Sequence, residues 1–458
     1  MNDTLAVIAG KLSARAIRVM RAGLGSNVPG RVSRAISPHV LANLARQARR
    51  GVLSVSGTNG KSTTSGFISS ILGQAGYKIA HNRQGANLVP GITASLIEAA
   101  QWNGQLDVDY CLFETDEAAL PVVAKEVKIN TVVVTNLFRD QLDRFGELDT
   151  TASLINKGIS VNKSKAILNA DDPNVAQLGA ESARLYYGIE SLTNSMTAGA
   201  SPLSGADVQE LAYCPKCGAE YHYDQFFYGQ LGHYVCGNCN HQRPKPDISA
   251  DGVTVTASGS QFTLKFGDHA VPMEIHLPGL FNVYNALAAA ALAVSLELPV
   301  DAIKRGLESY TTLFGRSERW RVRGKTVLIQ LIKNPAGASQ AVRAAVNDTN
   351  GRILIAINDN YADGRDVSWL WDAEFELLAQ HTKSIFVSGI RAADMAVRVK
   401  YCGIPQDKII VEPALEQALL AALDATDASQ TLWVLPTYTC LLQLEKIAKS
   451  MGSALSGT

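Results

Sequence analysis

Short apolar, β-branched runs alternate with helical stretches along most of the chain from residue 51 onward. In the helical stretches, of which the first is expected over 62–76, apolar residues return at helical spacing. Such runs, separated by helices, are typical of a parallel sheet that is covered on both faces. The pattern therefore predicts an α/β domain. Its expected strands are 51–56, 110–113, 131–135 and 166–168.

Residues 192–260 interrupt this alternation of strands and helices. They are rich first in Ser, Thr and Gly and then in Cys, and they end with a strand-like alternation of apolar and polar residues. We interpret them as an insertion, after which a helix is expected over 277–298. A second alternation begins after Trp320 and predicts a smaller, Rossmann-like α/β domain over 321–458, so that the first domain covers 51–320. The strands expected in the second domain are 327–329, 353–357, 384–387, 409–411 and 432–434.

The composition is that of a globular protein, with 458 residues, 47% hydrophobic and 18% charged. At roughly 150 residues per domain, this length predicts about three domains. The 42 Lys and Arg residues balance the 42 Asp and Glu residues, which argues against a nucleic-acid partner. The longest apolar run, 286–296, is shorter than the ~18–20 residues that cross a bilayer, and we find no secretory signal. We therefore expect a cytoplasmic protein.

The first fifty residues form a basic lead-in with helical spacing of its apolar positions. They hold nine Lys or Arg residues and one acid, Asp3. One interpretation is a solvated helix packed on the next domain, and the other is a surface that attracts anionic phospholipid or substrate phosphates. The nine cations are Lys11, Arg15, Arg18, Arg21, Arg31, Arg34, Arg46, Arg49 and Arg50.

A glycine-rich segment follows the first expected strand and opens the first expected helix. Glycines at 57 and 60 let backbone N–H groups turn toward phosphate oxygens, and the helix N-terminus adds partial positive charge. Lys61 is expected to reach the β- and γ-phosphates of a nucleotide, and the Ser62 hydroxyl to ligate Mg²⁺. A strict P-loop would have glycine where this chain has Val55. The expected nucleotide-binding residues are Gly57, Thr58, Asn59, Gly60, Lys61, Ser62 and Thr63.

A carboxylate is needed to complete such a metal site, because Mg²⁺ prefers hard oxygen ligands. Glu114 comes directly after the expected strand 110–113, at the edge of the sheet where ligands bind, and is the predicted ligand. Glu117 is the second candidate, and a solvated acidic turn is the alternative. Thr135, Asn136 and Asp140 end the next strand at the same edge, as groups supporting the site.

Four of the seven cysteines form two Cys-x₂-Cys pairs separated by eighteen residues. This spacing suits a tetrahedral four-thiolate Zn²⁺ site, and four protein ligands leave no open position, so the expected role is structural. Redox-active cysteines are the alternative. Cys111, Cys402 and Cys440 are expected to be buried, and His233 to lie at the surface. The predicted zinc ligands are Cys214, Cys217, Cys236 and Cys239.

Five motifs, in order over residues 51–320, resemble the Mur ligases and the folylpolyglutamate synthases: 57–62 (GTNGKS), 136–144 (NLFRDQLDR), 169–173 (NADDP), 282–286 (NVYNA) and 315–318 (GRSE). The resemblance implies the fold of that superfamily, with ATP phosphorylating a carboxylate and an amine displacing the phosphate. It also implies that Asn282 and Asn285 contact adenine and that Arg316 approaches the phosphates.

Three departures from the amino-acid-adding ligases narrow the resemblance. Gln141 replaces a frequent His, and 331–337 (LIKNPAG) lacks the usual Asp and His. Only about fifty residues precede the glycine loop, too few for a UDP-binding domain. With these departures and with the segments 358–372, 388–395 and 435–439, the sequence resembles the ligase-like subunits of lipid II isoglutaminyl synthases.

That resemblance implies amidation of the α-carboxylate of D-isoglutamate in lipid II, through an acyl phosphate, at the inner face of the membrane. It implies a heterodimer with a GatD-type glutaminase that supplies ammonia, because no Cys–His pair here suits glutamine hydrolysis. In that family an Asp of the C-terminal domain completes the partner's Cys–His pair, and Asp366 is the best match, with Asp363 second. A solvated loop carboxylate is the alternative. Trp369 and Trp371 are expected as interface or core anchors.

Two other functions stay open on the sequence. One is an amino-acid ligase of the Mur or folylpolyglutamate type, against which the altered 331–337 segment and the short N-terminus argue. The other is a nucleotide-responsive zinc adaptor that has no turnover. The first would need an amino acid as co-substrate, and the second would release no phosphate.

Overall fold

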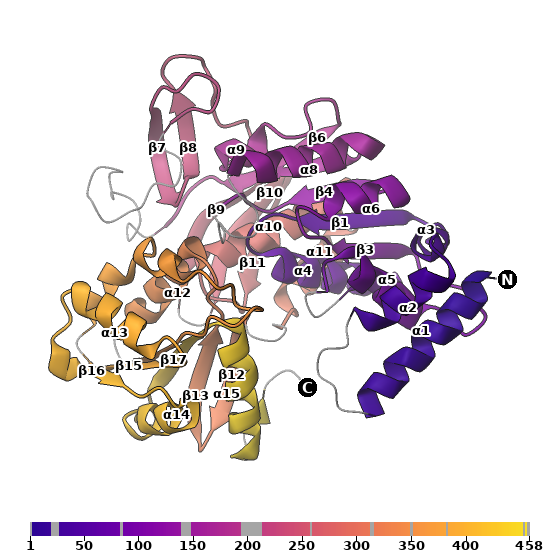
Figure 1. Cartoon of the computed structure of the whole chain (residues 1–458). Coiled ribbons are helices and arrows are strands. Elements are labelled where there is room, and N and C mark those ends of the chain that lie inside the picture. Colours follow the sequence, from indigo (N-terminus) through magenta and orange to yellow (C-terminus); the bar gives the residue numbers. More distant parts are fainter. Residues whose placement is uncertain are drawn as a thin grey trace.

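The computed structural model describes residues 2–19, 27–82, 86–138, 148–193, 213–256, 259–311, 316–348, 351–381, 383–451 and 454–455. Two sheet-based units and a group of N-terminal helices make up this part of the chain (Figure 1). In the described residues, no helix combines the length and the apolar character that crossing a membrane requires.

The first unit is built on a nine-stranded sheet of order β11-β10-β9-β6-β5-β4-β1-β3-β2. The pairs from β2 to β9 are parallel, and β9, β10 and β11 pair antiparallel. The parallel arrangement predicted from the apolar runs is confirmed. The strands are β1 (Gly51–Ser56), β2 (Ile79–His81), β3 (Tyr110–Glu114), β4 (Thr131–Val134), β5 (Lys165–Asn169), β6 (Arg184–Ile189), β9 (Ile248–Val255), β10 (Ser260–Phe266) and β11 (His269–Ile275).

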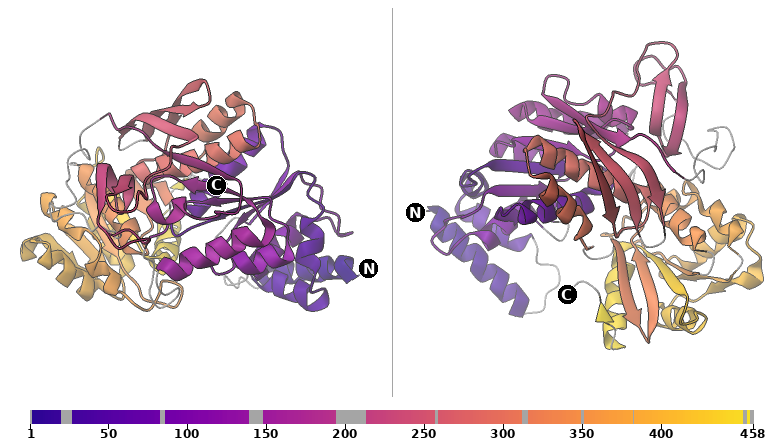
Figure 2. Two further views of the ribbon diagram at one scale, coloured as in Figure 1. Left: turned by 90° about the horizontal axis from the view of Figure 1, so that it is seen from above. Right: turned by 180° about the vertical axis from the view of Figure 1, so that it is seen from behind.

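Helices cover this sheet on both faces, which is why its central strands are apolar throughout. One buried layer joins α4 and α10 to the sheet, and the other joins α5, α6 and α8 to its opposite face (Figure 2). The helices are α4 (Lys61–Gln74), α5 (Val89–Ala99), α6 (Leu120–Glu126), α8 (Leu148–Asn162), α9 (Pro173–Ala176), α10 (Leu280–Ser295) and α11 (Val300–Glu308).

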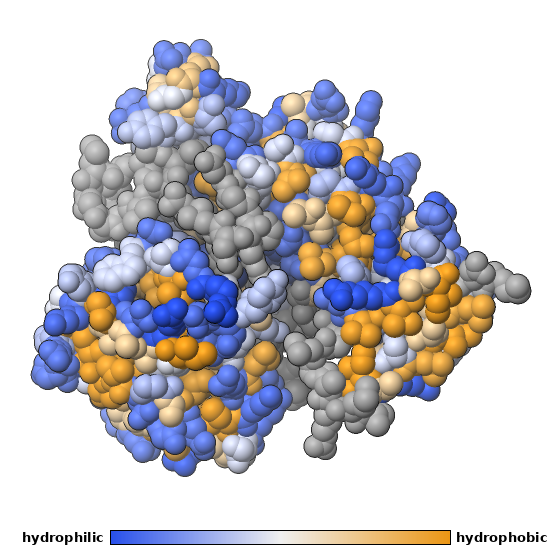
Figure 3. All heavy atoms as spheres, viewed as in Figure 1, coloured by the Kyte–Doolittle hydropathy of each residue, from blue (hydrophilic) through white to orange (hydrophobic). Residues whose placement is uncertain are grey.

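The N-terminal region forms the helices α1 (Asn2–Val19), α2 (Val28–Ile36) and α3 (Val40–Ala45). Val7 and Leu41 are fully buried in the same core as Ile92 of α5, so the expected lead-in packs on the first unit. The opposite side of α1 exposes Leu5 and Leu12 by 55% and 54%. Hydrophobic residues gather on the surface where α1 and α2 lie (Figure 3).

The insertion is shorter than the sequence analysis predicts. In its described part, the insertion forms a separate two-stranded hairpin of β7 (Tyr221–Tyr228) and β8 (Leu231–Cys236), preceded and followed by cysteine-bearing loops. Residues 248–255 are strand β9 of the main sheet, paired parallel with β6 and antiparallel with β10. The prediction that the insertion runs to residue 260 is therefore wrong, because the strand-like residues 248–255 belong to the main sheet.

The second unit contains a seven-stranded sheet of order β16-β15-β14-β17-β13-β12-β18, parallel except at β12 and β18. Strand β12 crosses the expected boundary at residue 320, because its first residues already pair with β13. The elements are β12 (Arg316–Val322), β13 (Lys325–Gln330), α12 (Pro335–Asn347), β14 (Arg352–Ala356), β15 (Ile385–Ser388), α13 (Ala392–Tyr401), β16 (Ile409–Val411), α14 (Leu415–Asp424), β17 (Thr431–Pro436), α15 (Tyr438–Ser450) and β18 (Ala454–Leu455).

Candidate active site and metal centre

The loop between β1 and α4, residues 57–61, is called the nucleotide loop below. Gly57 has a φ of 120° and Gly60 a φ of 83°, backbone conformations that favour glycine. A Cβ atom on Gly60 would lie 2.0 Å from Asn285 Oδ1, so a side chain has no room there. Gly60 precedes α4 and supplies no side-chain cap, which leaves the first N–H groups of the helix available to an anion.

The end of β4 holds the nucleotide loop in place. The Asn59 N–H donates to Asn136 Oδ1 at 2.9 Å, and the Asn59 carbonyl accepts from Thr135 Oγ1 at 2.7 Å. The Asn136 side chain also donates to the Asn59 carbonyl, at 3.1 Å. Thr135 and Asn136 thus support the site by shaping the loop itself. Asp140, which was predicted to support the site with them, lies outside the described residues, as does Gln141, which replaces a His that is frequent in related ligases.

Lys61, the first residue of α4, forms a buried ion pair with Glu117. Its Nζ lies 2.7 Å from Glu117 Oε1 and 2.5 Å from the Gly57 carbonyl oxygen. Burial lowers the pKa of Lys61, but the charges of Glu117, Glu114 and Asp116 outweigh that effect and raise it above its usual value. Lys61 is therefore a permanent cation beside the loop. Glu117, the second candidate for a metal ligand, is its counter-ion in this structure.

Glu114 is the last residue of β3 rather than the residue after it, and its side chain is buried. It pairs in register with Val55 of β1, directly before the nucleotide loop. Asn82 fixes this position, because its side chain accepts from the Glu114 N–H at 2.8 Å and donates to the Glu114 carbonyl at 2.7 Å. Glu114 thus lies at the carboxyl edge of the sheet beside the loop, and its role as a metal ligand stays a prediction.

The start of α10 brings Asn282 and Asn285 to the nucleotide loop. Asn285 Oδ1 accepts from Thr64 Oγ1 at 3.3 Å, and its Nδ2 donates to Asn282 Oδ1 at 3.2 Å. Both asparagines are buried. They line a cavity together with Gly60, the N-cap residue of α4, and Thr63 within α4. The asparagines implied by the resemblance therefore share one cavity with the loop. The Arg316 side chain is outside the described part of the structure.

This cavity lies between the two units. Besides the nucleotide loop and α10, its walls include Lys333, Ala336 and Gln340 of the second unit. Asn334 joins the units directly, because its Nδ2 donates to Asn59 Oδ1 at 3.0 Å. Asn334 also caps α12 by accepting from the Gly337 N–H at 2.9 Å, with Pro335 at the first helical position.

The part that Asn334 plays at this cavity is not among the predictions from sequence. The signal for it is Asn followed by Pro, a common helix start. Phe138 and Tyr228, which line the same cavity from the end of β4 and the tip of the β7–β8 hairpin, were not predicted either. Nothing in the sequence around Tyr228 indicates that this hairpin residue lines the cavity.

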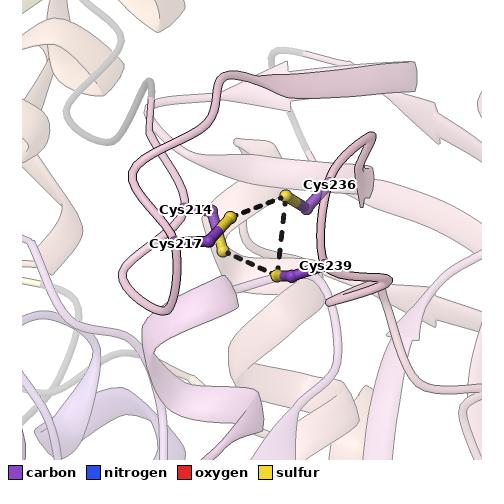
Figure 4. Close-up of side chains that lie close together, drawn as sticks. All are labelled: Cys214, Cys217, Cys236 and Cys239. Atoms are coloured by element: carbon purple, nitrogen blue, oxygen red, sulfur yellow. Dashed lines mark hydrogen bonds between the residues drawn. The ribbon is translucent and has the colours of Figure 1, made fainter.

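The four cysteines of the insertion come together as predicted, with all four Sγ atoms within 4.8 Å of one another. The pairs Cys214–Cys239, Cys217–Cys236 and Cys236–Cys239 are separated by 3.5, 3.4 and 3.7 Å between Sγ atoms, and the two loops face each other (Figure 4). A tetrahedral zinc–thiolate centre places sulfur atoms about 3.8 Å apart. The donor set therefore fits Zn²⁺.

Nearby side chains further support a metal centre. N–H groups from the backbone of Ala219 and the side chain of Asn238 lower the pKa of Cys217 to about 6, which favours the thiolate.

Two histidines near the cysteines have other partners. His241 is buried and its Nδ1 lies 2.7 Å from the Tyr221 hydroxyl. His233 is half-buried and its Nε2 lies 2.8 Å from the Ile189 carbonyl oxygen, so the prediction that it is a surface residue is wrong.

The loop after β14, residues 358–366, is called the acidic loop below. Asp363 is buried, and its carboxylate accepts from the Thr439 N–H at 2.7 Å and the Thr439 hydroxyl at 2.5 Å. Asp366 is half-exposed and accepts from the Ser368 N–H at 2.8 Å. The two carboxylates therefore differ: Asp363 is buried and held by Thr439, whereas Asp366 is only partly buried.

The two tryptophans after the acidic loop have separate positions. Trp369 is buried in the core of the second unit, and Trp371 is 54% exposed with its ring 5.7 Å from that of Tyr401. Tyr361 in the acidic loop is 85% exposed. One tryptophan is therefore a core anchor, and the other belongs to an exposed aromatic surface near Asp366.

Comparison with known proteins defines the class to which this fold and site belong. Residues 55–213 match the Mur ligase middle domain family, and residues 331–441 match the family described as MurT ligase C-terminal. The fold is similar to a pseudomurein peptide ligase type C from Methanothermus fervidus, with a TM-score of 0.70 and 23% identity over 89% of this chain and 80% of that chain. MurF ligase from Thermotoga maritima in complex with ADP gives a TM-score of 0.64 and 12% identity, over 92% and 84% of the two chains. The architecture is that of a Mur ligase.

Relatives that match over their full length are more specific. The chain is 36% identical over 454 residues to the lipid II isoglutaminyl synthase (glutamine-hydrolyzing) subunit MurT of Staphylococcus aureus (strain N315), covering 98% of this chain and 99% of that protein. The subunit of the same name from Streptococcus pneumoniae (strain ATCC BAA-255 / R6) is 31% identical, with 98% of each chain covered. The chain belongs to the MurT family of ligases.

Proposed function

We propose that this protein amidates the α-carboxylate of D-isoglutamate in the stem peptide of lipid II, using ATP and ammonia from a glutaminase partner. The observation that carries the proposal is the nucleotide loop, in which Lys61 lies beside buried carboxylates and the helix start opens on a cavity shared by the two units. The full-length match to MurT subunits supports the same substrate.

The described residues suit ATP with Mg²⁺. The uncapped N–H groups of α4 would hold phosphate oxygens, with Asn282 and Asn285 at the nucleoside end of the cavity. Ser62 and Glu114 would hold Mg²⁺, which neutralises charge on the phosphates when bound. Lys61 and Arg316 would stabilise charge on the transferring phosphoryl group.

The reaction then needs two displacements. A carboxylate oxygen of the substrate attacks the γ-phosphorus, the bond from that phosphorus to the β-bridging oxygen breaks, and ADP leaves. Ammonia attacks the acyl carbon of the resulting acyl phosphate, phosphate leaves, and the nitrogen loses a proton to give the amide. In this scheme the chain's own groups position the phosphates and stabilise their charge, because phosphoryl transfer asks little covalent chemistry of a protein.

The cysteines explain why the ammonia should come from a partner. Glutamine hydrolysis uses a thiolate nucleophile, and four of the seven cysteines are gathered at the metal centre. The other three, Cys111, Cys402 and Cys440, are buried as predicted, and burial raises the pKa of these thiols to about 12, 11 and 12. They are inert at neutral pH.

A GatD-type glutaminase, in a heterodimer with this chain, is the proposed ammonia source. Asp366 is the proposed carboxylate that orients its histidine, since it is less buried than Asp363 and belongs to a segment that also exposes Tyr361 and Trp371. Asp363, the second candidate, is held by Thr439 and does not face a partner. The metal centre has a structural role in this proposal, because four thiolates leave Zn²⁺ no open position.

Reconstitution tests the proposal and separates it from the alternatives. The chain is mixed with a GatD-type glutaminase, lipid II, glutamine and Mg·ATP, and both phosphate release and the mass of the product are measured. We expect one phosphate per amide formed and a product lighter than the substrate by about one mass unit. Phosphate release only with an added amino acid would instead show an amino-acid ligase, and nucleotide binding without phosphate release would show an adaptor.

We further propose that α1 rests on the membrane that carries the substrate. Its outer side exposes Leu5, Leu12 and Arg15, and the Arg15 guanidinium lies 4.9 Å from the ring centre of Trp102. Lys11 is half-buried, and its Nζ donates to the Glu98 carbonyl at 2.9 Å. Apolar and cationic side chains on one side of a helix favour an anionic lipid surface. The nine N-terminal cations do not form one uniform face. Arg34 pairs with Glu126, and Arg49 pairs with Asp107 and Asp109.

Vesicle sedimentation tests this surface. The heterodimer should bind vesicles that contain phosphatidylglycerol several-fold better than vesicles of phosphatidylcholine alone. Leu12→Ser with Arg15→Gln should remove most of that preference, whereas Val161→Ser, a change at an exposed apolar residue of α8, should leave it intact. Equal binding by both variants would overturn the assignment of α1.

A further inference from the structure

We infer that Tyr228, at the tip of the cysteine-bearing hairpin, contacts the purine nucleoside part of the bound nucleotide, and that the metal centre thereby supports nucleotide affinity. The inference rests on the proposed nucleotide site. It gives the insertion a part in substrate binding beyond holding its own fold together.

The hairpin tip is packed into the first unit. Tyr228 and Gln230 are 5% and 1% exposed, although the tip lies at the end of a two-stranded insertion. Gln230 Nε2 donates to the Leu137 carbonyl at 2.6 Å and to Asp172 Oδ2 at 3.2 Å. Gly229 has a φ of 61°, and a Cβ there would lie 2.5 Å from the Phe138 ring. The tip is therefore fixed against the segment that follows β4.

Tyr228 itself forms an aromatic wall of the cavity. Its ring stacks on Phe138 with centroids 5.9 Å apart and an angle of 16° between the rings, and it meets Tyr284 edge-on at 6.1 Å. The cavity lined by Tyr228 and Phe138 is also lined by Asn282 and Asn285 of α10. Aromatic rings that face a cavity with polar amides are typical of nucleoside subsites.

The hydroxyl of Tyr228 is suited to a ligand. In the part of the chain that the structure describes, this hydroxyl makes no hydrogen bond, whereas the neighbouring Tyr284 hydroxyl donates to Asp171 Oδ2 at 2.7 Å. Burial raises the pKa of Tyr228, so the phenol stays protonated and can donate. A ribose oxygen or a ring nitrogen of the base would accept that bond.

The same hairpin connects this wall to the metal centre. Strand β7 runs from Tyr221, which pairs with Cys236, to Tyr228, a span of about 23 Å for an extended strand. At the cysteine end, the buried residues that the structure describes are Cys214, Tyr221, Tyr234 and Cys236, with Ala219, Tyr223 and Cys239 packed against them. The tip is packed in the core of the first unit, but a two-stranded hairpin with so small a core at its other end is marginal without a crosslink, so the metal would order the strands that lead to Tyr228.

Nucleotide titration of the purified heterodimer tests the contact. Tyr228→Ala should weaken ADP binding about tenfold, as for loss of one base–aromatic contact, and Tyr228→Phe should weaken it less. Inorganic tripolyphosphate should bind both variants as it binds the parent, because the phosphate end of the site is unchanged. Gln225→Ala, an exposed change on the same hairpin, is the matched control. ADP binding within twofold of the parent in Tyr228→Ala would overturn the contact.

Metal removal tests the coupling. Chelation, checked by metal analysis, should weaken ADP binding of the parent by about the same factor as Tyr228→Ala and should have little further effect on that variant. An equal loss on chelation in both proteins would overturn the coupling. If the parent binds neither ADP nor tripolyphosphate, the proposed nucleotide function fails, and this outcome is distinct from a failure of the Tyr228 contact alone.

Discussion

The nucleotide loop and the acidic loop occupy equivalent positions in their two sheets and differ in how much they expose. Each follows a central parallel strand, β1 between β3 and β4 in one sheet and β14 between β15 and β17 in the other. The nucleotide loop turns inward, where Lys61 is buried beside Glu117, whereas the acidic loop exposes Tyr361 and half-exposes Asp366. In the proposed function, the carboxyl edge of a parallel sheet would serve a small ligand in one unit and a protein partner in the other.

The largest expected effect comes from the nucleotide loop. Lys61→Ala should lower amidation about 10⁴-fold with either glutamine or ammonium salts, because charge on the transferring phosphoryl group loses its cation. It should also lower the free energy of unfolding by about 3–5 kcal/mol, since Glu117 is left buried without its partner. Denaturant unfolding and product mass spectrometry measure the two effects.

A double variant separates those effects. Adding Glu117→Gln to Lys61→Ala should recover most of the stability and none of the activity, because the unpaired charge is gone but the cation is still missing. Recovered activity in the double variant would show that Lys61 serves the fold and not phosphoryl transfer.

In the acidic loop, the effect should depend on the nitrogen source. Asp366→Asn should lower glutamine-driven amidation about 10³-fold, because a histidine on the partner loses its orienting carboxylate. Amidation driven by ammonium salts should be unchanged, since the ligase site is intact. The rates with the two nitrogen sources are compared in the same heterodimer preparation.

Asp363→Asn is the matched variant in the same loop. It should lower the free energy of unfolding by about 1–3 kcal/mol through the Thr439 hydrogen bonds, and should affect both nitrogen sources alike. A selective loss of the glutamine route in Asp363→Asn, with Asp366→Asn unaffected, would exchange the roles of the two carboxylates.

Each of the two loops contains a glycine with positive φ that can be tested, Gly60 in the nucleotide loop and Gly364 in the acidic loop. Gly60→Ala should weaken ADP binding at least tenfold, since its Cβ would meet Asn285 Oδ1 at 2.0 Å. Gly364→Ala, at a φ of 92°, should cost about 1–2 kcal/mol of stability through backbone strain and leave ADP binding as it is. Titration calorimetry and thermal unfolding of both variants give the contrast.

The smallest effect is a pH dependence within the first unit. Burial raises the pKa of Asp172 to about 6 from its ordinary 3.8, so the folded state holds that proton more tightly than the unfolded chain. Stability from this group is full below the unfolded pKa and is lost as pH rises through 6, about 1 kcal/mol between pH 5 and 7. Unfolding of Asp172→Asn over that range should lack this component; an unchanged pH slope would refute the assignment.

Local sequence patterns predicted the first unit and its nucleotide loop well. The strand 51–56, the buried cysteines and the meeting of the four zinc-type cysteines are all confirmed, because periodicity and motif spacing are local. The insertion limits were wrong because strands β9 and β10 are defined by their partners in the sheet. The partnership of Lys61 with Glu117, the contact of Asn59 with Asn334 and the position of Tyr228 depend on tertiary packing, which no spacing encodes.

The insertion lies between two strands that run the same way. Strands β6 and β9 are parallel neighbours in the sheet, with Ile189 opposite Ala250. A parallel pair cannot be joined by a tight turn; the chain must return along the sheet, usually through a helix of a dozen residues or more. Here the cysteine-bearing hairpin lies on that return path. It is therefore part of the crossover connection of the sheet itself, and a chain shortened there would fold only with a substitute link of similar reach.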